Sequence, residues 1–152
     1  MNVTELFWAW AGACVAREVD TIADLYCTDA THAFPFRDGA PVIEGREAIR
    51  RHLSAGFGRA PVSFSGVKQA IVHHTEDPHT VIVECTFEGT LTATGAVFEP
   101  SYVEVVTERD GLIGAVRDYE NLAYPRGAIG HPPQCSPRSG LERPGRHNPG
   151  QP

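Results

Sequence analysis

The sequence has little that would suit it to binding nucleic acid. It contains no run of Lys and Arg, its only lysine is Lys68, and its net charge is −6 at pH 7. A nucleic-acid surface needs a basic patch over the phosphates, so this charge balance argues against such a partner.

Closely spaced cysteines are also missing. The sequence has no C-x-x-C pair and no His at zinc-finger spacing from a cysteine, although it contains Cys14, Cys27, Cys85 and Cys135. Such scatter does not fit a zinc site. The first three lie in apolar patterns, which is typical of buried thiols in a reduced compartment. We therefore expect a cytoplasmic protein without a bound metal.

No hydrophobic run approaches the length of a membrane span. The apolar segment from Leu6 to Ala16 follows Glu5 and no basic residue, whereas a secretory signal begins with positive charge. We therefore expect a first helix there, from Glu5 to about Glu18, capped by Thr4. Its apolar stripe would be Leu6, Trp10 and Cys14. Trp8 lies off this stripe and is either core or part of the mouth of a cavity.

Two further helices are expected before the long strands. One begins near Asp20 or Thr21 and ends around Thr28-Asp29, and it would bury Ile22, Leu25 and Tyr26. The other runs from Arg46 to about Ala55 and places Ile49, His52 and Leu53 on one face. A lone histidine on an apolar face is more often a satisfied core residue than a catalyst. Both interpretations of His52 remain open from the pattern alone.

Between these helices, residues 32–36 form a short extended segment, because Pro35 holds Phe34 out of the helical region. Phe34 and Phe36 should point to the same side. They are either core residues or the apolar wall of a binding site.

Extended strands dominate the second half. A strand from Val62 to about His74 is followed, after a turn at Asp77-Pro78, by three antiparallel strands between Thr80 and Asn121. In the last strand, Leu112, Gly114, Val116 and Asp118 should share a face. Asp118 therefore lies either at the wet end of the sheet or in a pocket, where desolvation would raise its pKa.

This order of elements predicts an α+β fold, in which a curved, cone-shaped antiparallel sheet wraps around three N-terminal helices and encloses a pocket. Residues 1–130 would form this domain. Residues 131–152 are rich in Pro and Gly with few large apolar side chains, so they should form a disordered tail.

The residues resemble a known group. Gly45-Arg46-Glu47 leading to His52, then Val83-Glu84-Cys85, then residues 110–113 leading to 117–121, are similar in order and separation to the nuclear transport factor 2-like superfamily. That superfamily includes ketosteroid isomerases, SnoaL-like polyketide cyclases and the phenazine-biosynthesis A/B proteins, and the phenazine group is the nearest likeness. In the phenazine A/B proteins, a histidine of the third helix and a glutamate of the last strand handle protons in the ligand pocket.

The resemblance implies that His52 and Asp118 are the catalytic pair, with aspartate in place of the glutamate. It also argues against ketosteroid isomerase chemistry, because no aspartate lies near Phe34 and the position of the strand-borne acid corresponds to Val103. An Asp-Arg-Asp epoxide hydrolase site is disfavoured as well, because Arg117 and Asp118 are adjacent on a strand and face opposite ways.

The leading hypothesis is a cofactor-independent enzyme of bacterial secondary metabolism. It would promote condensation, cyclisation or isomerisation of a small aromatic or polyketide-like intermediate by acid–base chemistry. The apolar wall would be Phe34, Phe36 and Trp8, with Tyr102 and Glu84 as polar contacts. The alternatives are a non-catalytic small-molecule-binding or adaptor protein and a protein-interaction domain, because a fold alone does not decide function.

A homodimer is also expected. It would form by packing of the outer sheet faces, for which Ile82, Val106 and Ile113 offer apolar surface.

Overall fold

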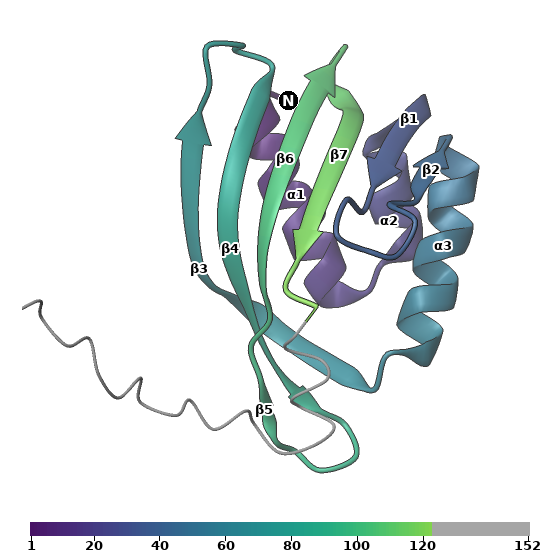
Figure 1. Ribbon diagram of the computed structural model, residues 1–152, viewed down its shortest axis with the longest axis vertical. Helices are drawn as coiled ribbons and strands as arrows, with labels where there is room; N and C mark the ends of the chain where they lie inside the picture. The colour runs from purple at the N-terminus through teal and green to yellow at the C-terminus, as the bar shows by residue number, and fades with distance from the viewer. Residues whose placement is uncertain (123–152) are drawn as a thin grey trace, which may run out of the picture.

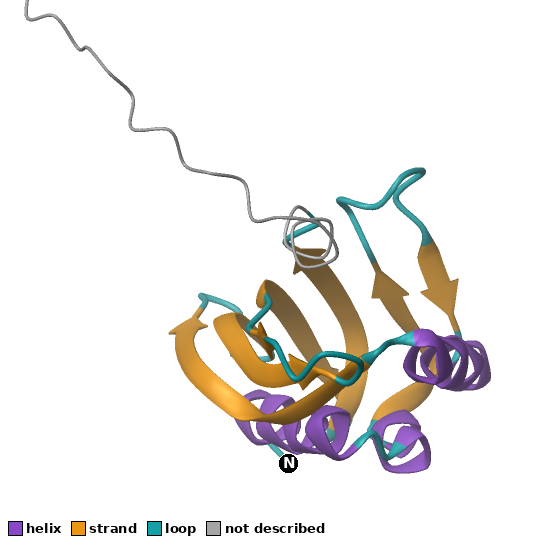
Figure 2. Ribbon diagram, turned by 90° about the horizontal axis from the view of Figure 1, so that it is seen from below, coloured by secondary structure: helices purple, strands orange, loops and turns teal. Residues whose placement is uncertain are grey.

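The computed structural model of the chain describes residues 1–122. Three helices, α1 (Val3–Ala16), α2 (Val19–Asp24) and α3 (Arg46–Arg59), lie on one side of a curved sheet (Figures 1 and 2). The sheet contains β1 (Tyr26–Ala33), β2 (Val42–Glu44), β3 (Val62–His74), β4 (Thr80–Leu91), β5 (Val97–Phe98), β6 (Ser101–Arg109) and β7 (Leu112–Glu120). The predicted α+β fold is confirmed. The predicted tail, residues 131–152, lies outside the described residues, so the domain boundary at residue 130 stays a prediction.

The four long strands follow the predicted antiparallel pattern. The strand order is β2-β1-β7-β6-β4-β3, with β5 paired to β4. In β4 the side chains of Val81, Val83, Cys85 and Phe87 are all buried, as the period-2 pattern requires. They pack against α1 in one continuous core that includes Leu6 and Phe7.

β1 is the main departure from the sequence-based expectation. Residues 26–29, expected to end the second helix, instead begin a strand that pairs in parallel with β7 and antiparallel with β2. The amide of Ile113 donates to the carbonyl of Leu25, so the ladder with β7 begins where α2 ends. Pairing with a distant strand here overrides the local helical pattern.

β7 contains a bulge at Gly114. Thr107 of β6 pairs with Ala115, whereas Glu108 pairs with Ile113, so Gly114 is the extra residue. On the N-terminal side of the bulge the side chains change faces, so Ile113 rather than Leu112 points inward and is buried. Val116 and Asp118 still share the inner face, as predicted.

The helix boundaries also shift. α1 begins at Val3 rather than Glu5, because the Asn2 side chain accepts from the Glu5 amide while the Glu5 carboxylate accepts from the Asn2 amide. α3 continues past Ala55 to Arg59. The guanidinium of Arg17 donates to the carbonyls of Phe57 and Ala60, which lie at the end of α3 and lack helical partners.

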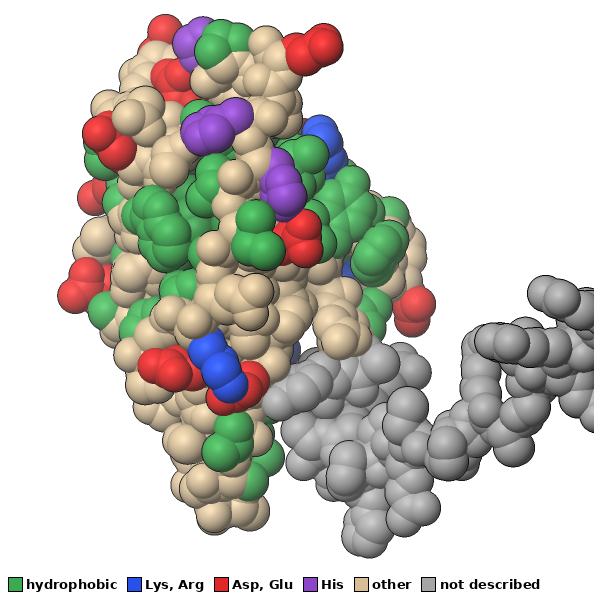
Figure 3. Space-filling view, turned by 90° about the vertical axis from the view of Figure 1, so that its left-hand side faces the viewer, with side chains coloured by type: hydrophobic (Ala, Val, Ile, Leu, Met, Phe, Trp, Pro, Cys, Tyr) green, Lys and Arg blue, Asp and Glu red, His purple; other side chains and the backbone are tan. Residues whose placement is uncertain are grey.

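The outer face of the sheet carries a cross-strand row of Ile71, Glu84, Val103 and Tyr119. Seen from the β3 side, hydrophobic side chains gather across the middle of the molecule (Figure 3). Val106 and Ile113 do not contribute to this surface, because they are buried in the core. Ile71 and Val103 are the exposed apolar residues of the row.

Candidate active site

A cavity of about 370 Å³ lies between the helices and the inner face of the sheet. Its walls are largely apolar. Along one side the ring of Phe87 contacts the rings of Phe64 and Tyr102, with centroids 5.5 and 5.7 Å apart. Phe34 and His52 form part of the opposite side. The predicted pocket inside the curved sheet is therefore present, and its size suits a small organic molecule.

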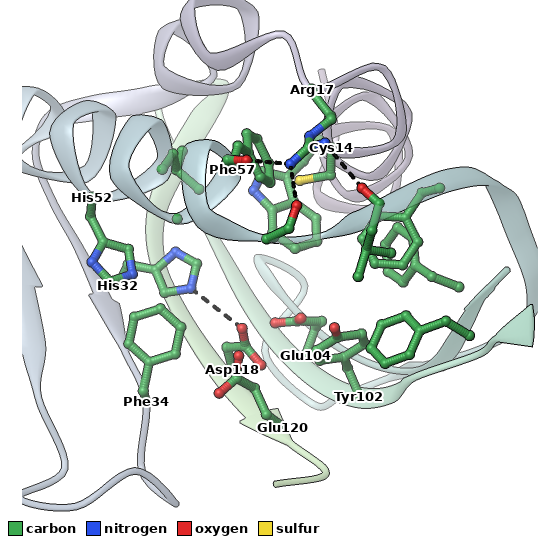
Figure 4. Close-up of a pocket in the computed structure, with 18 of the residues that line it drawn as sticks. Cys14, Arg17, His32, Phe34, His52, Phe57, Tyr102, Glu104, Asp118 and Glu120 are labelled. Carbon is green, nitrogen blue, oxygen red and sulfur yellow. Dashed lines mark hydrogen bonds and ion pairs between the residues drawn. The ribbon is translucent and has the colours of Figure 1, made fainter. Parts of the chain in front are cut away.

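Two buried carboxyl groups form the polar part of the cavity. Glu104 of β6 and Asp118 of β7 lie directly opposite each other on the inner face, and they are only 1% and 8% exposed. Tyr102 and Glu120, which are also paired across these two strands, continue this polar surface (Figure 4).

Burial controls the protonation of both acids. It raises the pKa of Glu104 well above its usual value, and the negative charges of Asp118 and Glu120 raise it further. Burial also raises the pKa of Asp118, although the nearby His32 partly opposes this shift. Since neighbouring buried carboxylates do not readily ionise together, Glu104 is the group that keeps its proton and can donate a hydrogen bond.

His32 of β1 points toward Asp118, with Nε2 3.9 Å from Oδ2 (Figure 4). This separation allows electrostatic attraction but is too long for a hydrogen bond. The other ring nitrogen, Nδ1, lies 2.9 Å from the hydroxyl of Tyr26, a side chain that is fully buried. When Tyr26 donates to Nδ1, the neutral ring carries its proton on Nε2, which faces Asp118.

The polar end of the cavity, where Glu104, Asp118 and His32 meet, is called its floor below. Three buried polar atoms at this floor lack a hydrogen-bond partner among the described residues: His32 Nε2, Glu104 Oε2 and Asp118 Oδ1. Leaving such atoms unpaired costs stability, so folded proteins usually avoid it. Their convergence on one cavity is typical of a site that pairs them with a ligand.

His52 lies on the wall beside Phe34, with ring centroids 5.3 Å apart. Burial lowers its pKa, and the positive charge of Arg37 lowers it further. His52 is therefore a neutral imidazole near neutral pH. In the view of Figure 4, the ring of His32 lies between His52 and Asp118.

The two arginines of the cavity wall already have partners. Arg37 binds Glu120 through two hydrogen bonds of 2.6 and 2.7 Å, and its guanidinium lies 3.6 Å from the centroid of the Phe34 ring. Arg17 donates to three backbone carbonyls, those of Phe57, Ala60 and Val62.

Four of the residues predicted from the sequence line this cavity: Asp118, His52, Phe34 and Tyr102. Phe36 is 62% exposed and instead lines a shallow hollow on the outer side, because the chain turns after Phe34. Trp8 is 46% exposed on α1. Glu84 lies on the outer sheet face, where it bonds to His73. These three positions are corrections to the expected lining.

The sequence pattern did not reveal the roles of His32 and Glu104. Glu104 stands between the apolar residues Val103 and Val105, yet Glu104 is buried and Val103 is exposed. An isolated glycine within a strand is a sign of a bulge, and Gly114 could have corrected the register that brings Glu104 opposite Asp118.

Within residues 1–122, no three acidic, His or Cys side chains are arranged to hold a metal ion. In the same part of the chain, no helix has both the length and the apolar character needed to cross a membrane.

Comparison with known proteins gives a consistent family. A family profile described as a SnoaL-like domain matches residues 3–116. An uncharacterized PhzA/B-like protein of Pseudomonas aeruginosa is 31% identical over 103 residues, which cover 64% of this chain and 69% of the relative.

Solved structures share the fold. The crystal structure of a proposed isomerase from Bacillus subtilis has a TM-score of 0.74 and 27% identity, covering 84% of this chain and 92% of the other. A proposed polyketide cyclase from Xanthomonas campestris has a TM-score of 0.65 and 20% identity, covering 79% and 90% of the two chains.

Proposed function

The chain belongs to the SnoaL-like domain family, close to its PhzA/B-like members, and on that premise we propose that its cavity performs acid–base catalysis on a small cyclic carbonyl compound. The convergence of Asp118, Glu104 and His32 at one buried floor carries this proposal. The isomerase and cyclase names of its structural neighbours agree with it.

The proposed reaction begins with proton abstraction. The carboxylate of Asp118 takes a proton from the carbon beside a carbonyl, and the carbon–hydrogen electron pair moves toward the carbonyl oxygen. The protonated Glu104 donates a hydrogen bond to that oxygen as negative charge develops on it. In an isomerisation, Asp118 then returns the proton to a different carbon. In a cyclisation, the enolate carbon attacks a second carbonyl of the same molecule, the electron pair of that carbonyl moves to its oxygen, and the oxygen takes the proton from Asp118.

The two histidines have different proposed roles. His32, held by Tyr26, orients Asp118 and stabilises its charged form. His52 is the second proton carrier that the resemblance implies, because it lines the same cavity and its lowered pKa leaves it free to accept a proton. The enzyme would need no bound cofactor for this chemistry.

The test uses 2-tetralone, a bicyclic ketone with acidic hydrogens beside its carbonyl. Purified protein in D₂O should accelerate deuterium incorporation at those carbons, followed by NMR. Asp118→Asn preserves the shape of the side chain but cannot take the proton, so we expect the exchange rate to fall by about a hundredfold to ten-thousandfold. Tetralone binding should remain.

The matched control is Asp29→Asn, which changes an exposed aspartate of β1 and should leave exchange unchanged. His32→Gln and His52→Gln should each slow exchange without preventing folding. Binding of tetralone with no exchange by the native protein would refute the proposal and favour the carrier alternative. Loss of folding in Asp118→Asn would make Asp118 a structural carboxylate.

A further inference from the structure

The charged groups that line the cavity determine which ligands it can accept. Among the described lining residues, basic groups belong to Arg17, Arg37, His32 and His52. Arg17 is used by three backbone carbonyls, and Arg37 is held by Glu120 in a two-point ion pair. Neither guanidinium is left to neutralise an anionic ligand.

The floor is correspondingly unfavourable for a negative charge. A ligand carboxylate placed there would lie beside Glu104 and Asp118, which are both buried. Bringing a further charge into such a site costs desolvation energy and adds repulsion from Asp118, and neither arginine of the described lining is free to compensate.

The hydrogen-bonding groups at the floor argue equally against an ammonium group. The carboxylic acid of Glu104 is a donor that needs an acceptor, and so is Nε2–H of His32 when Tyr26 donates to Nδ1; both lack an acceptor among the described residues. An ammonium group could pair with Asp118 Oδ1, but it has no acceptor to offer to these two donors. A carbonyl oxygen can accept both hydrogen bonds, while its neighbouring C–H faces Asp118.

The size and walls of the cavity limit the rest of the ligand. A volume of about 370 Å³ corresponds to roughly a dozen water molecules at ~30 Å³ each, hence to a compound of about a dozen non-hydrogen atoms. The rings of Phe34, Phe64, Phe87 and Tyr102 line the space and favour stacking on a flat ring system.

We propose that this site selects uncharged, ring-containing ketones or enols of about bicyclic size, and that it rejects carboxylic acids because Glu120 withholds Arg37 from the ligand. This inference rests on the proposed function for the placement of the carbonyl. Glu120 is then a specificity-determining residue.

The experiment compares three ligands with the same bicyclic skeleton: 2-tetralone, 2-aminotetralin and tetralin-2-carboxylic acid. Binding is followed at pH 7.5 by Trp10 fluorescence in the Trp8→Phe variant, because Trp10 lines the cavity and Trp8 and Trp10 are the two tryptophans of the chain. Tetralone should bind at least about tenfold more tightly than the amine or the acid.

A second pair of variants tests the role of Glu120. Glu120→Ala should release Arg37 and improve binding of tetralin-2-carboxylate, relative to binding of tetralone, at least about tenfold. The double variant Glu120→Ala/Arg37→Gln should lose that gain, which shows that the gain depends on the freed guanidinium.

Tighter binding of the acid or the amine than of tetralone would overturn the inference, as would failure of all three to bind. A gain of acid binding in the double variant would overturn the role of Glu120. These outcomes are separate from the proposed function, because selective binding of tetralone without deuterium exchange would refute catalysis and leave the selectivity standing.

Discussion

Glu104→Gln tests the electrostatics of the cavity through protein stability. The side chain is fully buried, and burial together with Asp118 and Glu120 raises its pKa well above the ordinary value. The folded protein therefore keeps the Glu104 proton at pH values where the unfolded chain, with a glutamate pKa of about 4.3, has lost it. Glutamine has nearly the same shape and no such proton.

Proton linkage determines whether Glu104 raises or lowers the free energy of unfolding as the pH rises. Above pH ~4.3 the folded state binds more protons than the unfolded state, so Glu104 makes the native protein less stable as the pH rises. While Glu104 stays protonated in the folded state, the loss is about 1.4 kcal/mol per pH unit, or about 3 kcal/mol between pH ~5.5 and ~7.5. While Glu104 stays protonated, Asp118 has an uncharged neighbour in both proteins, so its own contribution largely cancels.

We therefore expect Glu104→Gln to gain stability relative to the native protein as the pH rises. Urea unfolding followed by circular dichroism, repeated across this pH range, measures the difference directly. Glu44→Gln is the control, because Glu44 is exposed on β2 and should show no growing difference. A pH-independent difference between Glu104→Gln and the native protein would show that folding does not raise the pKa of Glu104.

Two other predictions concern assembly and the end of the chain. The outer sheet face, with Ile71 and Val103 exposed, should form the interface of a homodimer. Sedimentation should give a dimer at micromolar concentration, and Val103→Glu should shift the protein toward monomer. A native protein that is wholly monomeric would contradict this prediction. A chain ending at Gly130 should fold with an unchanged melting temperature, because residues 131–152 contain few large apolar side chains, whereas insolubility or a loss of several degrees would make that segment structural.

Local patterns predicted the part of the fold that depends on alternation along single strands. β3 has the bounds expected for it, and the inward residues of β4 are those of the period-2 pattern. The residues around Tyr26 were assigned wrongly because their strand conformation depends on pairing with β7, which lies far along the chain. Helix α3 was expected to end early because its last turn is held by Arg17, and a local pattern does not show this contact between distant residues.

The candidate site likewise combines features that local patterns predict with features that depend on contacts between distant residues. Asp118 was placed on an inner face by alternation, and His52 by helical spacing together with the family resemblance. The opposition of Glu104 and Asp118 depends on the register between two strands and on the bulge at Gly114. The approach of His32 depends on the parallel pairing of β1 with β7. A single sequence pattern does not determine either relation, so the immediate neighbours of Asp118 emerged only from the structure.

The pH dependence of tetralone exchange, measured for the native protein and for Asp118→Asn, tests the central claim most directly. Because burial raises the pKa of Asp118, the native rate should climb with pH through an apparent pKa above about 3.9, the ordinary value for aspartate. This apparent value belongs to the coupled pair of Glu104 and Asp118 rather than to one residue. Asp118→Asn should lack the rise and remain slower by about a hundredfold or more. Equal rates with the same pH profile in both proteins would show that Asp118 is not the base.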